Sequence, residues 1–518
     1  MASLRLFAPF CRQAPAATAV NEAGGLAYSR DPRAALALYA STGCLNGTYY
    51  ADDEQQLTQV LALCAEVDAG FVARVAIHAR QHGHMKDMPA LLLATLASRD
   101  GSAFAQAFGR VVDNGRMLRN VVQILRSGRT GRRSLGSLPK RLVRQWLDRA
   151  SVHQIVQAAI GQQPSLADVI RMVHPKPADA EREALYAWVL GRPYREEALP
   201  SLLKHYEAFK RASEGALPDL PFAYFTSLPL QQSHWQALAR QVSWQTLRMN
   251  LNTFARNGVF KDAGLVAEVA ARLCDPALIG RARVFPYQLL AARDAAAASP
   301  EAIGQALDQA LEIATRQVPV LQGRVVVAVD VSGSMAAPVT GVRKGATSKV
   351  RCVDAAALLA ACVRRGNPKA RVLPFDTAVR KVELTADAAV LVQARQLAAL
   401  CGGGTTISAP LAALNRERAQ VDLLVLVSDN QSWCETRQHG PTETMRQWQL
   451  LKQRCPAARL VCIDLQPART SQLVERDDVL HIGGFSDAVF QLLADYAERG
   501  GDARHWVERI EAIALATH

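Results

Sequence analysis

Three oxygen-bearing side chains stand on one short segment, at Asp330, Ser332 and Ser334. They follow an apolar run, residues 325–329, whose length and β-branching are typical of a buried parallel strand. In open α/β sheets, ligands bind beyond the carboxyl ends of such strands. One carboxylate and two hydroxyls are hard oxygen donors, which Mg²⁺ prefers. We therefore predict a divalent-cation site just past this strand.

Two later segments supply further donors for such a site. Residues 401–406, Cys-Gly-Gly-Gly-Thr-Thr, form a glycine loop that ends in hydroxyls, and residues 422–428 form a second apolar strand that Asp429 follows directly. The order of donors resembles the metal-ion-dependent adhesion site of von Willebrand factor A domains. The matching positions are Asp330, Ser332, Ser334, Thr405 and Asp429. The alternative is a strand-end turn without metal, because Asp and Ser are common turn residues.

Positive charge gathers in one part of the chain. The net charge of the 518 residues is +13, and residues 101–150 alone hold 11 Arg and Lys against 2 Asp and Glu. A local basic cluster is the electrostatic footprint of a polyanion-binding surface. The residues that we assign to it here are Arg129, Arg132, Arg133, Lys140, Arg141 and Arg144. The alternative is a solvated helix face.

The elements that must position these groups fall into two kinds. Over residues 1–320, apolar residues recur at helical spacing in segments of about 10–15 residues, broken at Gly, Pro or Asn. Short connections between such helices predict a HEAT-like repeat array. Over residues 321–518, strands alternate with helices, which predicts a doubly wound parallel sheet. We expect strands at 324–330, 371–376, 422–428, 458–464 and 479–482, and a ligand-contacting loop at 335–347.

Further motifs allow a family resemblance to be stated for the N-terminal part. Residues 42–50, Thr-Gly-Cys-Leu-Asn-Gly-Thr-Tyr-Tyr, resemble a stretch near the start of TROVE domains. Residues 166–177, which close in His174-Pro-Lys176-Pro, and residues 282–287, Ala-Arg-Val-Phe-Pro-Tyr, resemble two later signatures of that family. A TROVE domain followed by a von Willebrand A domain is the architecture of Ro ribonucleoproteins.

The resemblance implies a helical ring closed by the A domain. It implies that small noncoding Y-like RNAs bind a basic outer surface, and that single-stranded ends of structured or misfolded RNAs enter the central hole. An exoribonuclease such as polynucleotide phosphorylase is an implied partner, and Mg²⁺ is the implied cofactor. It adds Arg171, His174 and Lys176 to the expected RNA contacts. The preference for Arg over Lys and the abundance of Ala fit a bacterial member.

Alternative functions remain open at the level of the sequence. A protein-binding adaptor would use the metal site to capture a partner's carboxylate, but it has no need of the basic cluster. A metal hydrolase needs a general base, and no His lies near the predicted donors. We therefore expect an RNA-binding scaffold that is not an enzyme. His174 could instead simply cap its helix, and His78, His82 and His84 are expected to be structural or surface residues.

Composition limits the setting of the protein. No run of about 18 uncharged apolar residues is present, so no membrane span is expected. The apolar region of the N-terminus is too short for a secretory signal. The ten cysteines form no Cys-x-x-Cys pair, which argues against a zinc site and a disulfide framework. A reducing cytoplasm is the expected location.

Overall fold

The computed structural model describes most of the chain. The described residues are 14–42, 45–212, 215–282, 284, 286–316, 318, 320–342, 350–385, 387–434, 439–484, 489, 490, 493, 496 and 505–515. Four sequence predictions therefore lie partly outside the described residues: Gly43 and Cys44 of the 42–50 motif, Arg283 with Phe285 of the 282–287 motif, the end of the 335–347 loop, and a last helix that the alternation of strands and helices predicts at 486–498. Within the described part, no helix is long and apolar enough to cross a membrane.

The predicted helical array is confirmed, and its helices end where capping residues and glycines stand in the sequence. Asp52, Ser151 and Ser165 each cap a helix through a reciprocal side-chain exchange with the third helical residue. The α-helices of this part are α1 Pro32–Thr42, α2 Asp53–Glu66, α3 Ala69–Gln81, α4 Asp87–Arg99, α5 Gly101–Val111, α6 Gly115–Arg126, α7 Ser137–Arg149, α8 Val152–Ala158, α9 Leu166–Val173, α10 Ala180–Leu190, α11 Ser201–Ala212, α12 Gln232–Gln241, α13 Trp244–Met249, α14 Leu251–Arg256, α15 Ala263–Leu273, α16 Pro276–Ala282, α17 Pro286–Ala295 and α18 Glu301–Thr315.

We predict mainly helices before residue 320, and the described residues depart from this pattern at the N-terminal end. Strands β1 Ala19–Val20 and β2 Leu26–Ser29 form a hairpin, and β2 pairs antiparallel with β7 Thr470–Ser471 of the C-terminal part. Strands this short carry too few alternating residues for a period of two to be visible. The pairing joins segments more than 400 residues apart, so the first described residues belong to the C-terminal sheet region.

The C-terminal part holds the predicted parallel sheet. Five strands lie in the order β4-β3-β5-β6-β8, and every neighbouring pair is parallel. The strands are β3 Val325–Asp330, β4 Arg371–Phe375, β5 Leu423–Ser428, β6 Arg459–Asp464 and β8 Val479–Gly483. All six residues of β3 and of β5 are buried, as their uninterrupted apolar sequences indicate.

Helices cover both faces of this sheet, so it is doubly wound. Alternate residues of β3 and β5 point to opposite faces. Val327 and Val425 share a core with α19 Cys352–Gly366 and α20 Val390–Ala398, whereas Ala328 and Leu426 share a second core with α21 Ala409–Arg416 and α22 Glu443–Arg454. The first core continues without a break into the helical array.

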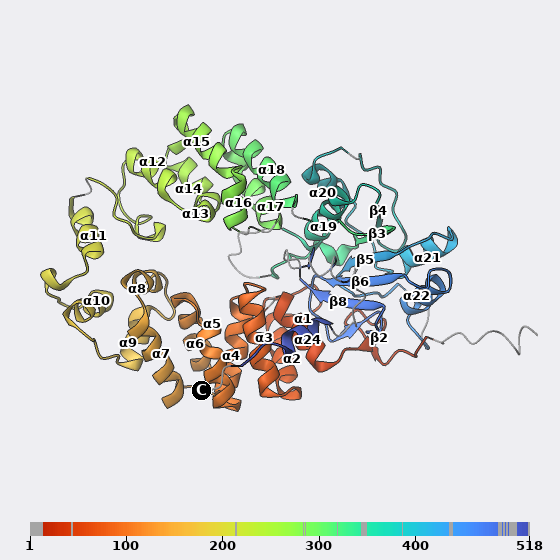
Figure 1. The fold of residues 1–518 in the computed structure, drawn as a ribbon, viewed down its shortest axis with the longest axis horizontal. Helices are drawn as coiled ribbons and strands as arrows, with labels where there is room; N and C mark the ends of the chain where they lie inside the picture. The colour runs from red at the N-terminus through yellow and green to blue at the C-terminus, as the bar shows by residue number, and fades with distance from the viewer. Residues whose placement is uncertain are drawn as a thin grey trace, which may run out of the picture.

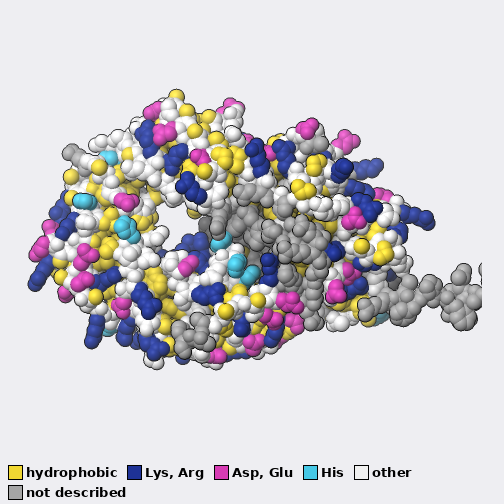
Figure 2. Space-filling view, viewed as in Figure 1, with side chains coloured by type: hydrophobic (Ala, Val, Ile, Leu, Met, Phe, Trp, Pro, Cys, Tyr) yellow, Lys and Arg dark blue, Asp and Glu magenta, His cyan; other side chains and the backbone are white. Residues whose placement is uncertain are grey.

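The helices run in an arc whose two ends both meet the sheet domain (Figure 1). At one end α17 and α18 pack on α19 and α20. At the other end α1 packs on β8, and a late helix, α24 His505–Glu511, returns to pack on α1 and α3. The array and the sheet domain therefore close a ring. Figure 2 shows an opening in it, between the α4–α8 side and the α13–α16 side.

A buried ion pair links the segment after β2 to the end of β6. Arg30, just after β2, contacts Asp464 at the end of β6 at 2.6 Å, and both side chains are about 2 % exposed. Burial opposes ionisation of Asp464, but the charge of Arg30 and a bond from His481 hold the pKa of this carboxyl below its usual value. Removing one partner of such a pair leaves the other charge buried and alone.

Replacing Arg30 with Met is expected to lower the free energy of unfolding by about 3 kcal/mol, because Asp464 loses its partner. Denaturant unfolding of the whole chain measures this. Arg33→Met is the matched control: Arg33 pairs with Asp68 and Glu511, but all three side chains are 38–53 % exposed. Exposed pairs contribute at most about 1 kcal/mol. Equal losses of stability in the two variants would show that the Arg30 pair is unimportant.

Candidate metal centre and basic surface

Asp330 ends β3 at the sheet edge where the predicted metal donors meet. One carboxylate oxygen accepts from the backbone N–H of Ser332 at 2.9 Å, and the other accepts from the hydroxyl of Ser428 at 2.6 Å. The hydroxyls of Ser332 and Ser334 lie 3.2 Å apart. The chain turns into a short 3₁₀ helix at Gly333–Ala336, which brings both serines back over the strand end.

Asp429 faces this cluster from the end of the neighbouring strand, β5. Its carboxyl interacts with the hydroxyl of Ser334 and lies close to the Asp330 carboxylate. Burial, and then the negative charge of Asp330, raise the pKa of Asp429 to about 7. One of its oxygens, Oδ2, is buried and has no hydrogen-bond partner among the described residues. Two buried carboxylates that face each other need a compensating positive charge.

Thr405 lies on the glycine loop, which packs against the first donor loop. The N–H of Gly333 donates to the carbonyl of Gly403 at 3.0 Å, and the N–H of Gly402 donates to the carbonyl of Val331 at 2.7 Å. Gly403 has a φ of +81°, and a Cβ there would come within 2.9 Å of an Asp376 carboxylate oxygen. Glycine is therefore required for this approach. Thr405 itself is 1 % exposed.

These donors fit a small hard cation. The five predicted residues come from three separate segments, and the structure brings their loops together at one sheet edge, each nearly or fully buried. The unpartnered Asp429 Oδ2 is the oxygen that a cation would satisfy. The donors are carboxylates and hydroxyls, which suit Mg²⁺ rather than a soft metal. In the described part of the chain, no group of three His, Cys, Asp or Glu residues offers a competing site.

Three residues of this region were missed by the sequence predictions. Ser428 bonds Asp330, and Asp376 adds a negative charge beside it from the end of β4. Both stand at the carboxyl end of an apolar run, so strand-end position was an available signal. The third is Tyr50, whose hydroxyl interacts with Ser334. No local pattern could have placed Tyr50 there, because it precedes β3 by more than 270 residues.

The nine predicted RNA contacts lie on the surface of neighbouring elements of the helical array. They lie on the loop between α6 and α7, on α7, and at and just past the end of α9, and α7 packs on α9. The N–H of the Arg144 guanidinium donates to the carbonyl of Val173, which ties α7 to the end of α9. His174 follows in the left-handed conformation, with φ of 52°, and turns the chain toward Lys176. We call this surface the α7–α9 basic surface.

The structure divides these nine residues into two groups. Arg129 pairs with Glu54, Arg171 pairs with Asp168, and Arg132 and Arg144 bond backbone carbonyls. For the side chains of the other five, no hydrogen-bond or ion-pair partner is found among the described residues. These are Arg133, Lys140, Arg141, His174 and Lys176. Their positive or polar ends are therefore available to a ligand, whereas the first group also holds the loop and the helices in place.

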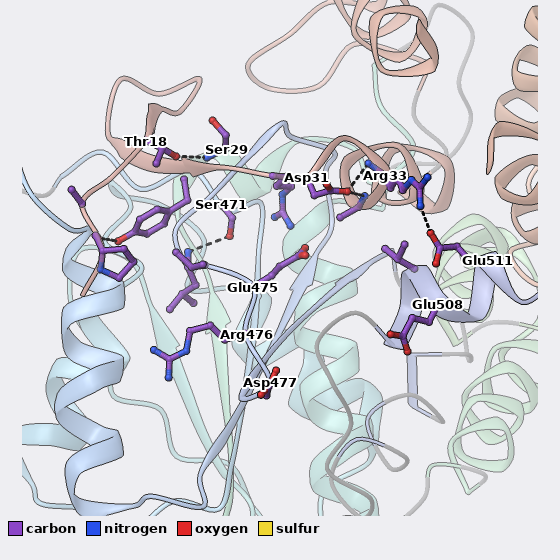
Figure 3. Close-up of a pocket in the computed structure, with 18 residues that line it drawn as sticks. Thr18, Ser29, Asp31, Arg33, Ser471, Glu475, Arg476, Asp477, Glu508 and Glu511 are labelled. Carbon is purple, nitrogen blue, oxygen red and sulfur yellow. Dashed lines mark hydrogen bonds and ion pairs between the residues drawn. The ribbon is translucent and has the colours of Figure 1, made fainter. Parts of the chain in front are cut away.

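A cavity of about 1020 Å³ lies elsewhere, where the ends of the chain meet (Figure 3). Its lining residues come from the segment around β2, from residues 471–477 and from α24. The three arginines that line it already have acidic partners. Glu475, Asp477 and Glu508 add negative charge without a described partner. This cavity therefore disfavours polyanions, and the basic surface is the better candidate for nucleic acid.

Comparisons with known proteins agree with this architecture. The Ro60 von Willebrand A (vWA) domain family matches residues 324–497. The chain is 27 % identical over 516 residues to a Deinococcus radiodurans protein named RNA-binding protein RO60, covering 92 % of this chain and 94 % of that one. The crystal structure of the Deinococcus radiodurans RO (RSR) protein matches with a TM-score of 0.64 and 22 % identity, covering 90 % of this chain and 99 % of that one. Residues 324–497 therefore match the Ro60 vWA domain family, and the chain is similar over most of its length to a bacterial protein named RNA-binding protein RO60.

Proposed function

We propose that this protein is an RNA-binding scaffold that holds a structured small RNA on the α7–α9 basic surface. The observation that carries the proposal is the set of five polar or basic side chains on that surface for which the described part of the chain offers no partner. The chain is also similar to one named an RNA-binding protein. Figure 1 places α7 and α9 on the outer side of the arc, away from the opening. We propose a small noncoding Y-like RNA as the ligand of this surface.

Phosphate contacts explain how the surface would bind a folded RNA. Arg133 and Arg141 offer planar guanidiniums that can grip phosphate oxygens in pairs, and Lys140 offers a point charge between them. Gly128, Gly131 and Gly136 all have positive φ values, so the loop bends closely without Cβ atoms at its turns. Contacts of this kind read shape and charge rather than base sequence.

The opening of the ring is the proposed passage for single-stranded ends. Figure 2 shows Lys and Arg side chains along its edge, which would attract a phosphate backbone. A single strand is narrower and more flexible than an A-form duplex, so it needs a smaller opening. We further propose that misfolded or structured RNAs with free ends are accepted there for quality control, and that an exoribonuclease such as polynucleotide phosphorylase then acts on them. Mg²⁺ is the proposed occupant of the Asp330 site.

A hairpin RNA with a single-stranded 3′ tail is expected to bind more tightly than the same hairpin made blunt. The duplex part contacts the basic surface in both RNAs, and only the tail adds contacts at the opening. A gain of about 1 kcal/mol for each stacked or contacted nucleotide would give at least a tenfold preference with two such contacts. Competition binding at one ionic strength measures it.

The control RNA carries an equally long tail that is paired to a complementary strand. It carries the phosphates of the tail and of the added strand, but as a duplex it is too wide for a narrow opening. If the tailed, paired and blunt RNAs bound equally, the opening would play no part, and the outer surface alone would account for binding.

A further inference from the structure

The Thr48-Tyr49-Tyr50 stretch of the helical part lies against the candidate metal centre of the sheet domain. The side-chain amide of Asn46 donates to the carbonyl of Thr340 at 2.7 Å. The N–H of Val342 donates to the carbonyl of Gly47 at 2.7 Å, which forms an isolated antiparallel bridge. Residues 340–342 continue the loop that begins with the donors Ser332 and Ser334. The two halves of the chain therefore meet beside the metal donors.

Tyr50 extends from this contact to the donors themselves. Its hydroxyl interacts with the side chain of Ser334, and the carboxylates of Asp429 and Asp330 lie close enough to act on it. A tyrosine phenol has an ordinary pKa of about 10, so it is protonated at neutral pH. A protonated phenol presents a neutral oxygen and a hydrogen-bond donor to this anionic cluster.

The neighbouring residue shows that this placement is specific. The ring centroids of Tyr49 and Tyr50 lie 4.8 Å apart, edge to face, yet Tyr49 is 59 % exposed and Tyr50 is about half-buried. Contacts within the helical part fix the backbone on which this difference in exposure depends. The N–H of Thr48 donates to the carbonyl of Ala51 at 2.7 Å, and the Asp52–Gln55 capping box starts α2 at once.

We propose that Tyr50 closes the cation site from within the chain, so that a bound divalent cation ties residues 46–52 of the helical ring to the sheet domain. The inference rests on the cation site proposed above and goes beyond RNA binding. It assigns the cation a structural role at the ring closure. A carboxylate from a partner protein would have to displace Tyr50 to reach the cation.

Hydrogen exchange of the full-length protein, with and without Mg²⁺, tests this role. In the wild type, Mg²⁺ is expected to slow amide exchange over residues 45–52 and 340–342. Tyr50→Phe removes only the hydroxyl. Because one hydrogen bond contributes about 1 kcal/mol, this variant should bind Mg²⁺ about fivefold more weakly. The slowing of amide exchange by Mg²⁺ should fall by a similar factor. Tyr49→Phe is the matched control and should behave as the wild type.

A second variant tests whether the site is covered. Mn²⁺ replaces Mg²⁺ as a spectroscopic probe, and acetate serves as the outside carboxylate. Acetate should change the paramagnetic resonance spectrum of Mn²⁺ bound to Tyr50→Ala, but not of Mn²⁺ bound to the wild type. Equal responses of the two proteins, or unchanged exchange at 45–52 on adding Mg²⁺, would overturn the proposal. A wild type that binds neither ion would refute the cation site itself, while the RNA-binding proposal would stand.

Discussion

Changing Arg133, Lys140 and Arg141 together to Gln is expected to lower the affinity for a structured RNA by about 10²- to 10³-fold. Each unpaired cation accounts for a charge-assisted interaction of about 1–1.5 kcal/mol. Binding to phosphates also releases counterions, so the slope of log affinity against log salt should fall by about one for each phosphate that no cation neutralises in the variant. Filter-binding titrations at several salt concentrations give both values. These three residues are preferred because the structure gives no internal role to their charged ends.

A control variant separates a local effect from a general reduction of positive charge. Lys369, Arg416 and Arg418 are exposed on the sheet domain, and no partner of theirs is found among the described residues. Changing these three to Gln removes an equal number of positive charges from the other half of the molecule. This variant is expected to bind RNA nearly as well as the wild type. If affinity and slope fell equally in both triple variants, the α7–α9 basic surface would have no special part in binding.

Asp330→Ala is expected to abolish the stabilisation of the protein by Mg²⁺. A ligand at about 100 times its Kd stabilises the native state by about 2.7 kcal/mol, and the variant should show none of this gain. Asp330 is the best target because it supplies one of two facing carboxylates, both of which a cation needs. Thermal unfolding with and without Mg²⁺, together with calorimetric titration, measures the effect.

The same substitution should leave the fold and RNA binding intact. Without a cation, removing Asp330 ends its repulsion of Asp429 and costs the bonds from Ser428 and from the N–H of Ser332, about 1 kcal/mol each. Asp422→Ala is the control, because this carboxylate stands at the opposite end of β5 and pairs with Arg324 in an exposed position. A fall in RNA affinity in Asp330→Ala as large as that of the basic triple variant would contradict separate roles for the two halves.

Much of the architecture was predictable because it depends on local patterns. A period of 3.6 residues with capping residues at the ends located most helices, and unbroken apolar runs located the five parallel strands. The grouping of the proposed donor residues was also predictable, since the carboxyl ends of neighbouring parallel strands meet at one edge of a sheet. Asp330 and Asp429 could therefore be placed together although nearly 100 residues separate them.

Other features depended on packing between distant segments, for which no local signal exists. The β2–β7 pairing and the Arg30–Asp464 ion pair join the two ends of the chain only because the ring closes. Ring closure likewise brings Tyr50 to Ser334. The basic cluster was visible as composition, but the packing of α7 on α9 decided which of its cations bond the protein itself and which remain available. Residue types and spacing determined the chemistry that this chain can perform, and the tertiary structure decided which side chains are positioned to perform it.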